Sequence, residues 1–191
     1  VAIRAGGRRD GELAMVKSVF EVLTPGLQTT IQDWPGRIGY WRIGIPPSGP
    51  MDELSFRRAN LLVENDQGAP ALEVQFMGPK LKVLSSCHAA ISGGICRPIL
   101  NDVPVEMNRT FMMKRGDVLD IGAVRTGART YLAVTGSFDK EKVLGSSATF
   151  PRAKIGGGTL AAGEVLRLAS DRKLSAQWRL KRGCEPERKD N

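Results

Sequence analysis

Short β-type runs that follow one another along most of the chain are the feature that most constrains its fold. Glycine, proline or asparagine bounds most of these runs, and they recur at a spacing of about 8–12 residues. This spacing is typical of a sandwich or barrel. The runs are KSVFEVLT, LQTTIQD, ALEVQF, KLKVL, HAAISG, RPILN, VPVEM, DVLDIG, RTYLAVTG and EVLRL.

One segment has the periodicity of a helix instead. Pro50 suits the first helical position, because its missing N–H would have no partner there. Asn65 and Gly68 are plausible stop signals. The sequence therefore predicts a helix from about Pro50 to Val63 in a chain that is otherwise mainly β. The apolar stripe of this helix would consist of Met51, Leu54, Ala59 and Leu62.

The two ends of the chain differ from the middle. Residues 1–16 are rich in glycine and arginine without periodicity, which predicts a disordered leader, with Met15 as a natural start. Residues 170–191 form a charged tail with a single tryptophan, Trp178, which we expect to be disordered or to bind a partner. Residues 17–169 are expected to form one domain, since 191 residues fit one domain with disordered ends.

The charge and hydropathy patterns exclude two classes of partner. The net charge is +8, but half of the excess lies in the two ends, so the signal for nucleic-acid binding is weak. No apolar run approaches the roughly 18 residues of a membrane span, and the start lacks the apolar core of a secretory signal. We therefore expect a soluble, cytoplasmic protein with neither a nucleic-acid nor a membrane partner.

Cysteine and histidine usage argues against a metal site. The three cysteines, Cys87, Cys96 and Cys184, are odd in number and lack CxxC spacing, which favours free or buried thiols over a disulfide framework or a zinc ribbon. His88 is the single histidine and lies in an alternating run that suggests a strand, so we expect it to be packed or rim-exposed rather than catalytic. The motifs GxxxxGK[ST], GxSxG and HExxH do not occur. No metal is predicted.

The loop SGPMD, which enters the expected helix, could hold a small ligand. Free backbone N–H groups at a helix start coincide with the positive end of the helix dipole, and such a place attracts a carboxylate or carbamate. Ser48 can donate a hydrogen bond, and Asp52 can stabilise the helix or accept from a urea-like N–H. The alternative is a helix cap that follows a stiff turn.

A second polar group precedes this loop. Gln32, Asp33 and Arg37 lie within six positions and combine an amide, a carboxylate and a guanidinium, which suit a small amide or urea. The alternative is an Asp33–Arg37 ion pair that pins a turn. Neither stretch alone identifies a function.

Together the two stretches do more. The segment GLQTTIQDWPGRIGYWRIGIPPSGPMDELSFRRANLLVEND resembles the carboxyltransferase region of urea carboxylase (urea amidolyase), in a family that also includes allophanate hydrolase subunit 2 and the C-type subunit of 5-oxoprolinase. The resemblance covers roughly residues 19–168 and is strongest to the urea carboxylase branch. It implies a cyclophilin-like β-barrel with one short helix. It also implies transfer of a carboxyl group from carboxybiotin to a urea or amide nitrogen, or, in the oxoprolinase branch, ATP-dependent opening of a cyclic amide.

The resemblance also implies site residues and partners. The role of the site would be positioning and electrostatics. Carboxybiotin would come from a partner domain and would not be bound tightly by this chain. The expected partners are a biotinyl carrier and a companion lobe that is similar to allophanate hydrolase subunit 1 or to the B-type subunit of 5-oxoprolinase. The expected catalytic residues are Asp33, Arg37 and Asp52, and the expected substrate-binding residues are Gln32, Tyr40, Ser48, Gly49 and Met51.

Several departures from the family pattern limit what we expect of this chain. Glu64 and Ser137 stand where the family usually has glycine, and the loop before Gly163 looks shortened. The family sequence continues well beyond Leu168, with a loop rich in His, Asn and Asp that is expected at the site. We therefore expect a first lobe that is inactive alone. The alternatives are a component of the 5-oxoprolinase C type and a non-catalytic truncated paralogue that docks on a partner.

Overall fold

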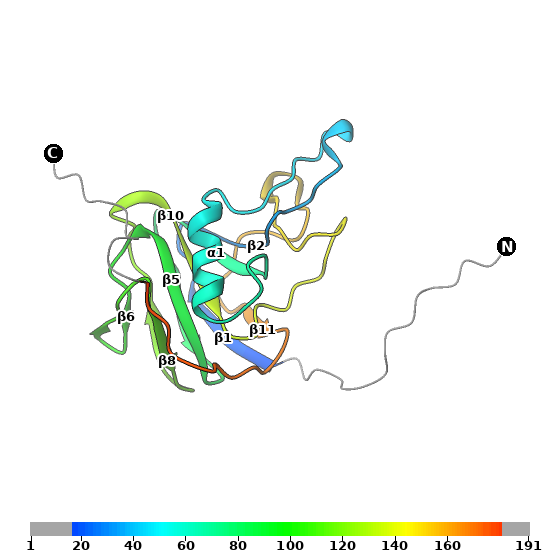
Figure 1. Ribbon diagram of the computed structural model, residues 1–191. Coiled ribbons are helices and arrows are strands. Elements are labelled where there is room, and N and C mark those ends of the chain that lie inside the picture. Colours follow the sequence, from blue (N-terminus) through cyan, green and yellow to red (C-terminus); the bar gives the residue numbers. More distant parts are fainter. Residues whose placement is uncertain (1–16, 181–191) are drawn as a thin grey trace.

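The computed structural model describes residues 17–180, which form a mainly β structure with one α-helix (Figure 1). The helical elements in this range are η1 (Trp41–Ile43), α1 (Glu53–Leu62) and η2 (Pro151–Ala153). The strands are β1 (Lys17–Thr24), β2 (Gln28–Gln32), β3 (Ala71–Gln75), β4 (Lys80–Val83), β5 (Cys87–Ile95), β6 (Ile99–Leu100), β7 (Val103–Pro104), β8 (Thr110–Met113), β9 (Val118–Asp120), β10 (Thr126–Val134) and β11 (Val165–Leu168).

The strands form two antiparallel sheets around one apolar core. The six-stranded sheet has the order β11-β1-β4-β9-β6-β7, and the five-stranded sheet has the order β2-β3-β10-β5-β8. Strands β1 and β10 each pair with a neighbour on both sides. The core between the sheets includes Phe20, Val22, Leu72, Val74, Leu81, Ile91, Leu119, Leu132, Val134 and Phe138, all almost fully buried.

The outer face of the five-stranded sheet is also apolar, and α1 covers it. Because successive side chains of a strand point to opposite faces, Leu132 enters the core while Tyr131 faces α1. Phe56 of α1 meets Tyr131 edge-on, with ring centroids 5.7 Å apart. Burying a side chain such as Phe56 stabilises the fold by about 1.5–3 kcal/mol. The helix therefore forms a second, smaller core on this face.

The expected fold is confirmed: a mainly β structure with one short helix, its strands arranged in two antiparallel sheets. Every predicted β-type run contains a strand, and the sequence analysis missed β8. The helix begins at Glu53 rather than Pro50, because Asp52 is its N-cap and accepts a hydrogen bond from Ser55 N at 3.0 Å. Pro50 therefore belongs to the turn that precedes the cap.

Two of the cysteines are free and buried, as expected. Burial raises the pKa of the Cys87 thiol to about 12, so it is an unreactive side chain at neutral pH. His88 lies on β5 and is partly buried. Cys184 and the predicted leader lie outside the described residues. Within residues 17–180, no group of three or more His, Cys, Asp or Glu side chains is arranged to hold a metal ion, and no helix is long and apolar enough to cross a membrane.

Candidate functional site

Asp33 follows β2 directly and is turned into the protein. Its carboxylate accepts hydrogen bonds from Ser146 Oγ at 2.5 Å, Ser147 N at 2.8 Å and Ala148 N at 3.1 Å. Only 7% of Asp33 is exposed. The carboxylate therefore holds the chain at residues 143–149, which we call the 143–149 loop, and both of its oxygens are engaged there.

Arg37 holds the same loop through its carbonyl groups. The guanidinium is fully buried and donates from Nε to Val143 O at 2.9 Å and from Nη2 to Ala148 O at 2.7 Å. Its Nη1 atom has no partner in the described chain. No ion pair joins Arg37 to Asp33 among the described residues, so the Asp33–Arg37 ion pair that the sequence suggested as an alternative is not formed. Asp33 binds donors of the 143–149 loop, and Arg37 binds acceptors of it.

Gln32 links this buried region to the loop before the helix. Its Nε2 atom donates to Thr30 Oγ1 at 2.9 Å and to Thr149 O at 3.1 Å, and its Oε1 atom accepts from Gly49 N at 3.1 Å. Because Gly49 has φ of +86° and lies against the backbone of Asp33, this approach favours glycine. We call Gln32, Asp33 and Arg37 the anchor, since all three side chains tie loops together.

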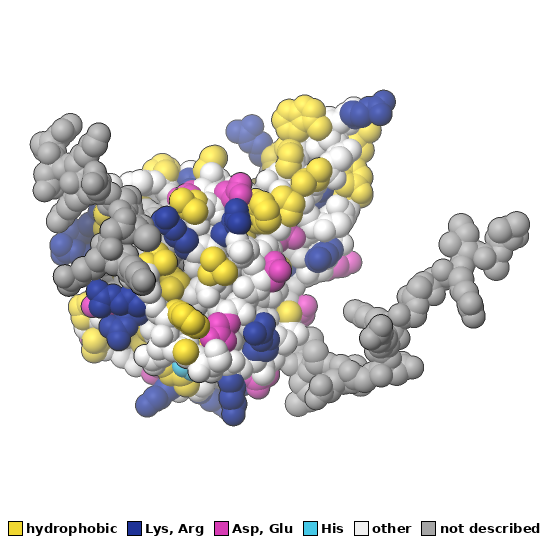
Figure 2. Space-filling view, in the orientation of Figure 1, with side chains coloured by type: hydrophobic (Ala, Val, Ile, Leu, Met, Phe, Trp, Pro, Cys, Tyr) yellow, Lys and Arg dark blue, Asp and Glu magenta, His cyan; other side chains and the backbone are white. Residues whose placement is uncertain are grey.

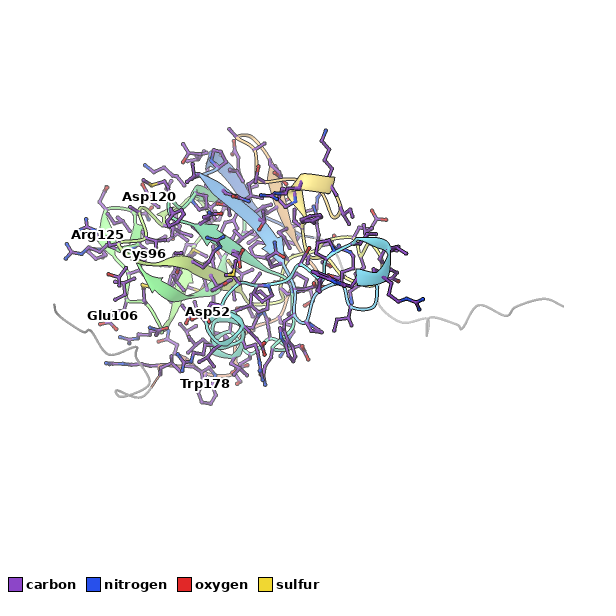
Figure 3. The ribbon with its side chains drawn as sticks, turned by 90° about the horizontal axis from the view of Figure 1, so that it is seen from above. Asp52, Cys96, Glu106, Asp120, Arg125 and Trp178 are labelled. Atoms are coloured by element: carbon purple, nitrogen blue, oxygen red, sulfur yellow. The ribbon has the colours of Figure 1, made fainter. Side chains whose placement is uncertain are left out.

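An internal carboxylate occupies the helix start that the sequence analysis proposed for a ligand. Glu73 Oε2 accepts from Met51 N at 2.7 Å and from the Tyr131 hydroxyl at 2.8 Å. The same hydroxyl accepts from Asp52 N at 2.7 Å. Burial and the neighbouring Glu73 charge raise the pKa of Tyr131, so its O–H remains a donor. Asp52 lies beside α1 (Figure 3) and is committed to capping Ser55.

The sequence analysis missed Glu73, Tyr131 and Arg129 in this cluster. Arg129 Nε lies 3.4 Å from Glu73 Oε1, and both side chains are mostly buried. The alternation in ALEVQF could have identified Glu73, because it places Glu73 on the same strand face as Ala71. That face is the one that α1 covers. An acidic residue there requires a donor from the helix or its loop.

The remaining predicted residues lie on a segment that projects from the body (Figure 1). Residues 38–48, which we call the protruding loop, carry large apolar side chains into solvent (Figure 2). Tyr40 is the N-cap of η1, and Ser48 Oγ is buried without a partner in the described chain, at a φ of +57°. Ile38, Trp41 and Ile43 are 65–72% exposed.

The structure therefore joins some of the predicted residues and separates others. Gln32 meets Gly49 directly, Asp33 and Arg37 meet through the 143–149 loop, and Met51 meets Asp52 through the Glu73 cluster. Their roles in binding or catalysis stay predictions. A separate hollow of about 750 Å³ contains none of them. It is lined by the turns after β1 and β3, including Leu27, Phe76 and Met77, and by Lys80 of β4 and Asp120 of β9.

Comparison with known proteins shows which family this chain belongs to. Residues 43–191 match the family model of the carboxyltransferase domain, subdomains A and B. The chain is 50% identical over 149 residues to urea amidolyase of Lachancea kluyveri, covering 78% of this chain and 8% of that protein. It is 33% identical over 162 residues to the C-type subunit of 5-oxoprolinase from Haemophilus influenzae, covering 83% of this chain and 52% of that protein.

Solved structures agree with these matches. The structure of the urea carboxylase of Kluyveromyces lactis superimposes with a TM-score of 0.78 and 47% sequence identity, over 80% of this chain and 14% of that chain. The chain thus spans about half of the bacterial relative and a small part of the fungal ones. Because the family model covers more than half of the sequence, this chain belongs to the family of carboxyltransferase domains, subdomains A and B.

Proposed function

We propose that this chain is the first lobe of a biotin-dependent carboxyltransferase that acts on urea or a urea-like amide, and that it is inactive alone. The observation that carries the proposal is the 47% identity to the K. lactis urea carboxylase over 80% of the chain, with a TM-score of 0.78. The match covers only 14% of that protein, which supports a lobe rather than a complete enzyme.

The chemistry of the anchor supports the second part of the proposal. Carboxybiotin, when bound, would supply the activated carboxyl group, and its site must present free donors to the carboxylate and the ureido oxygen. Asp33 offers no donor, and both N–H groups of Gln32 are engaged by this chain's own loops, which leaves the buried Arg37 Nη1 as the unpartnered donor of the anchor in the described chain. The anchor therefore does not by itself form a site for carboxybiotin. In this proposal the anchor positions the loop and helix start from behind, and the companion lobe completes the site.

A few polar groups of this chain remain for a small substrate. Ser48 Oγ has no partner, and the amides of Glu53 and Leu54, at the positive end of α1, have no acceptor in the described chain. These groups suit the carbonyl oxygen or the developing negative charge of a urea-like molecule. Asp52, next to them, would orient an N–H group of that molecule with whatever acceptor capacity its capping bonds leave.

The protruding loop supports a companion lobe as the partner. Three large apolar side chains, Ile38, Trp41 and Ile43, expose most of their surface on one projection. An apolar group of this kind marks an interaction site, and tryptophan is enriched among residues that dominate binding. The relatives extend beyond the matched segment and so contain chain that is available to cover it.

A chimera tests the function. Residues 17–180 of this chain would replace the matching segment of the K. lactis urea carboxylase, and urea-dependent incorporation of labelled bicarbonate would be measured. We expect activity within about tenfold of the parent enzyme. A folded chimera that still carboxylates its biotin but does not carboxylate urea would contradict the proposal. The isolated chain with free carboxybiotin should transfer nothing, and transfer by it would overturn its assignment as an incomplete lobe.

A component of the 5-oxoprolinase C type is the second candidate. The observation that favours it is the larger share of the relative that is matched, 52% of the H. influenzae protein. Mixing this chain with a purified B-type partner and measuring ATP-dependent formation of glutamate from 5-oxoproline separates the two candidates. The higher identity to the urea enzymes, 50% against 33%, leads us to expect no glutamate.

A further inference from the structure

The segment that follows β11 runs along the free edge of the five-stranded sheet. It passes below α1 and then beside β8 (Figure 1). Thr110 N donates to Trp178 O at 2.9 Å, Trp178 N donates to Thr110 Oγ1 at 3.0 Å, and Leu180 N donates to Asn108 O at 3.1 Å. Arg179 pairs with Arg109 in an antiparallel bridge. The sequence analysis expected this region to be disordered or partner-binding, whereas residues 175–180 add a short strand-like segment to the sheet.

Glu64 holds this segment from the end of α1. Its carboxylate accepts from Ser175 N at 3.0 Å, Ala176 N at 3.3 Å and Trp178 Nε1 at 2.8 Å, and from the Ser175 hydroxyl. A carboxylate offers about four acceptor positions, and here they serve one short segment. Every hydrogen bond of this carboxylate within residues 17–180 goes to residues 175–178. Trp178 lies at the surface near α1 (Figure 3).

The backbone conformation at Glu64 disfavours a glutamate and so reduces the stability of the barrel. Glu64 follows the C-cap Val63 and has a φ of +55°. This left-handed position after a helix is usually glycine, since a Cβ atom is disfavoured there. A glutamate at this position therefore strains the helix end, and the contacts that its side chain makes are with the segment rather than with the barrel.

We propose that Glu64, the end of α1 and the edge of β8 form a docking site for an extended peptide, and that residues 175–180 of the same chain are its occupant. The site recognises a small hydroxyl residue, with the indole N–H of a tryptophan three positions later. Leu180 fills the apolar end of the site, where it packs against the second, smaller core beneath α1. Occupation covers the β8 edge, which would otherwise present unpaired backbone groups to other chains. This inference is independent of the carboxyltransferase function.

Charge state supports the same arrangement. Hydrogen bonds from the Ser175 and Trp178 side chains and from the Ser175 amide lower the pKa of Glu64 to about 2. The carboxylate is therefore ionised throughout the pH range used for hydrogen exchange. Glutamine at this position would keep one acceptor oxygen and lose the charge, which makes Glu64→Gln an intermediate variant.

The test is hydrogen–deuterium exchange on the full chain. In Glu64→Gly we expect the amides of Thr110, Trp178 and Leu180 to exchange about tenfold faster or more, because they open with the segment. The midpoint of thermal unfolding should stay the same or rise, since the strained φ is relieved. Glu64→Gln should give a smaller acceleration. Glu53→Gln is the matched control on the same helix, because Glu53 contacts Arg57 and not the segment.

Three results would overturn the proposal. Unchanged exchange at Trp178 and Leu180 in Glu64→Gly would mean that the segment is held without Glu64. Equal acceleration of central amides on β10 would mean that Glu64 supports the whole barrel rather than a docking site. Acceleration in Glu53→Gln as large as in Glu64→Gly would have the same meaning.

Discussion

Residues 32–37 and the protruding loop, residues 38–48, adjoin in the chain and belong to the same glycine- and proline-rich stretch of sequence, yet they differ physically. The first contains the anchor, whose polar side chains are buried and bonded to loops far away in sequence. The second exposes apolar side chains and glycines, and Trp41 is 72% exposed. The comparison separates a buried framework from an exposed apolar loop, which we propose as the contact surface for the companion lobe, although a single motif contains both.

The largest effect should come from the framework. Asp33→Ala removes the acceptor of Ser146 Oγ, Ser147 N and Ala148 N in a buried place, and we expect the free energy of unfolding to fall by about 3–5 kcal/mol. Chemical denaturation followed by circular dichroism measures this change. Asp139→Ala, at an exposed carboxylate, is the control and should stay within about 0.5 kcal/mol. Equal values for the two variants would remove the distinction between framework and surface.

The junction between the two regions should be nearly as sensitive. A Cβ atom on Gly36 would lie 2.7 Å from Pro47 O and 2.9 Å from Ser48 O, at a φ of +85°. We therefore expect Gly36→Ala to destabilise by about 2–3 kcal/mol. Gly39→Ala is the matched control, because Gly39 also has a positive φ but no atom within 4 Å of its added Cβ. It should cost about 1 kcal/mol. A Gly36 variant no worse than the Gly39 variant would show that the protruding loop is not held closely to the framework.

The contact surface should respond in binding rather than in stability. Trp41→Ser should leave the free energy of unfolding within about 0.5 kcal/mol and weaken binding to the companion lobe about tenfold. Isothermal titration calorimetry with the rest of the K. lactis carboxyltransferase domain measures the affinity. Leu27→Ser, at a side chain that is 67% exposed in the separate hollow, is the control. Similar losses from both variants would refute a specific role for the protruding loop.

The smallest effect is expected at Ser48. Its buried Oγ has no partner in the described chain, so Ser48→Ala loses no hydrogen bond, and stability should change by less than about 0.5 kcal/mol. Carboxylation by the chimera should nevertheless fall, because in the proposed function the hydroxyl binds the substrate. Thermal unfolding and the bicarbonate assay, run on the same preparation, read the two quantities. Full activity in the alanine variant would place Ser48 outside the site.

Local patterns were enough to predict most of the fold. Alternation with glycine and proline boundaries predicted strands such as β5 and β10, because strand side chains alternate between the two faces and turn residues act locally. The run TFMM of β8 was missed, since it lies between Asn108 and Lys114 without glycine or proline beside it. Its pairing with β5 decides its structure.

The site was harder to predict because its partners are distant in sequence. Asp33 was selected from the sequence as a polar residue of the candidate site, but its donors, Ser147 and Ala148, lie more than 100 positions away. Glu73 meets Met51 only because β3 and β10 place it under the helix start. Residue type alone indicates that buried polar groups require hydrogen-bond partners. The fold determines that these partners lie in loops of the same chain.

The Glu73 carboxylate is tethered beside the helix start, so it competes with any free carboxylate for the donors there. It is held against Met51 N and Tyr131 by the strand that carries it, so its effective concentration at those donors exceeds the millimolar range of a flexibly linked group. A free carboxylate present at lower concentration is displaced from the same two donors. Under the proposed function, a ligand of this face therefore has to use donors that Glu73 leaves free, such as the next amides of α1.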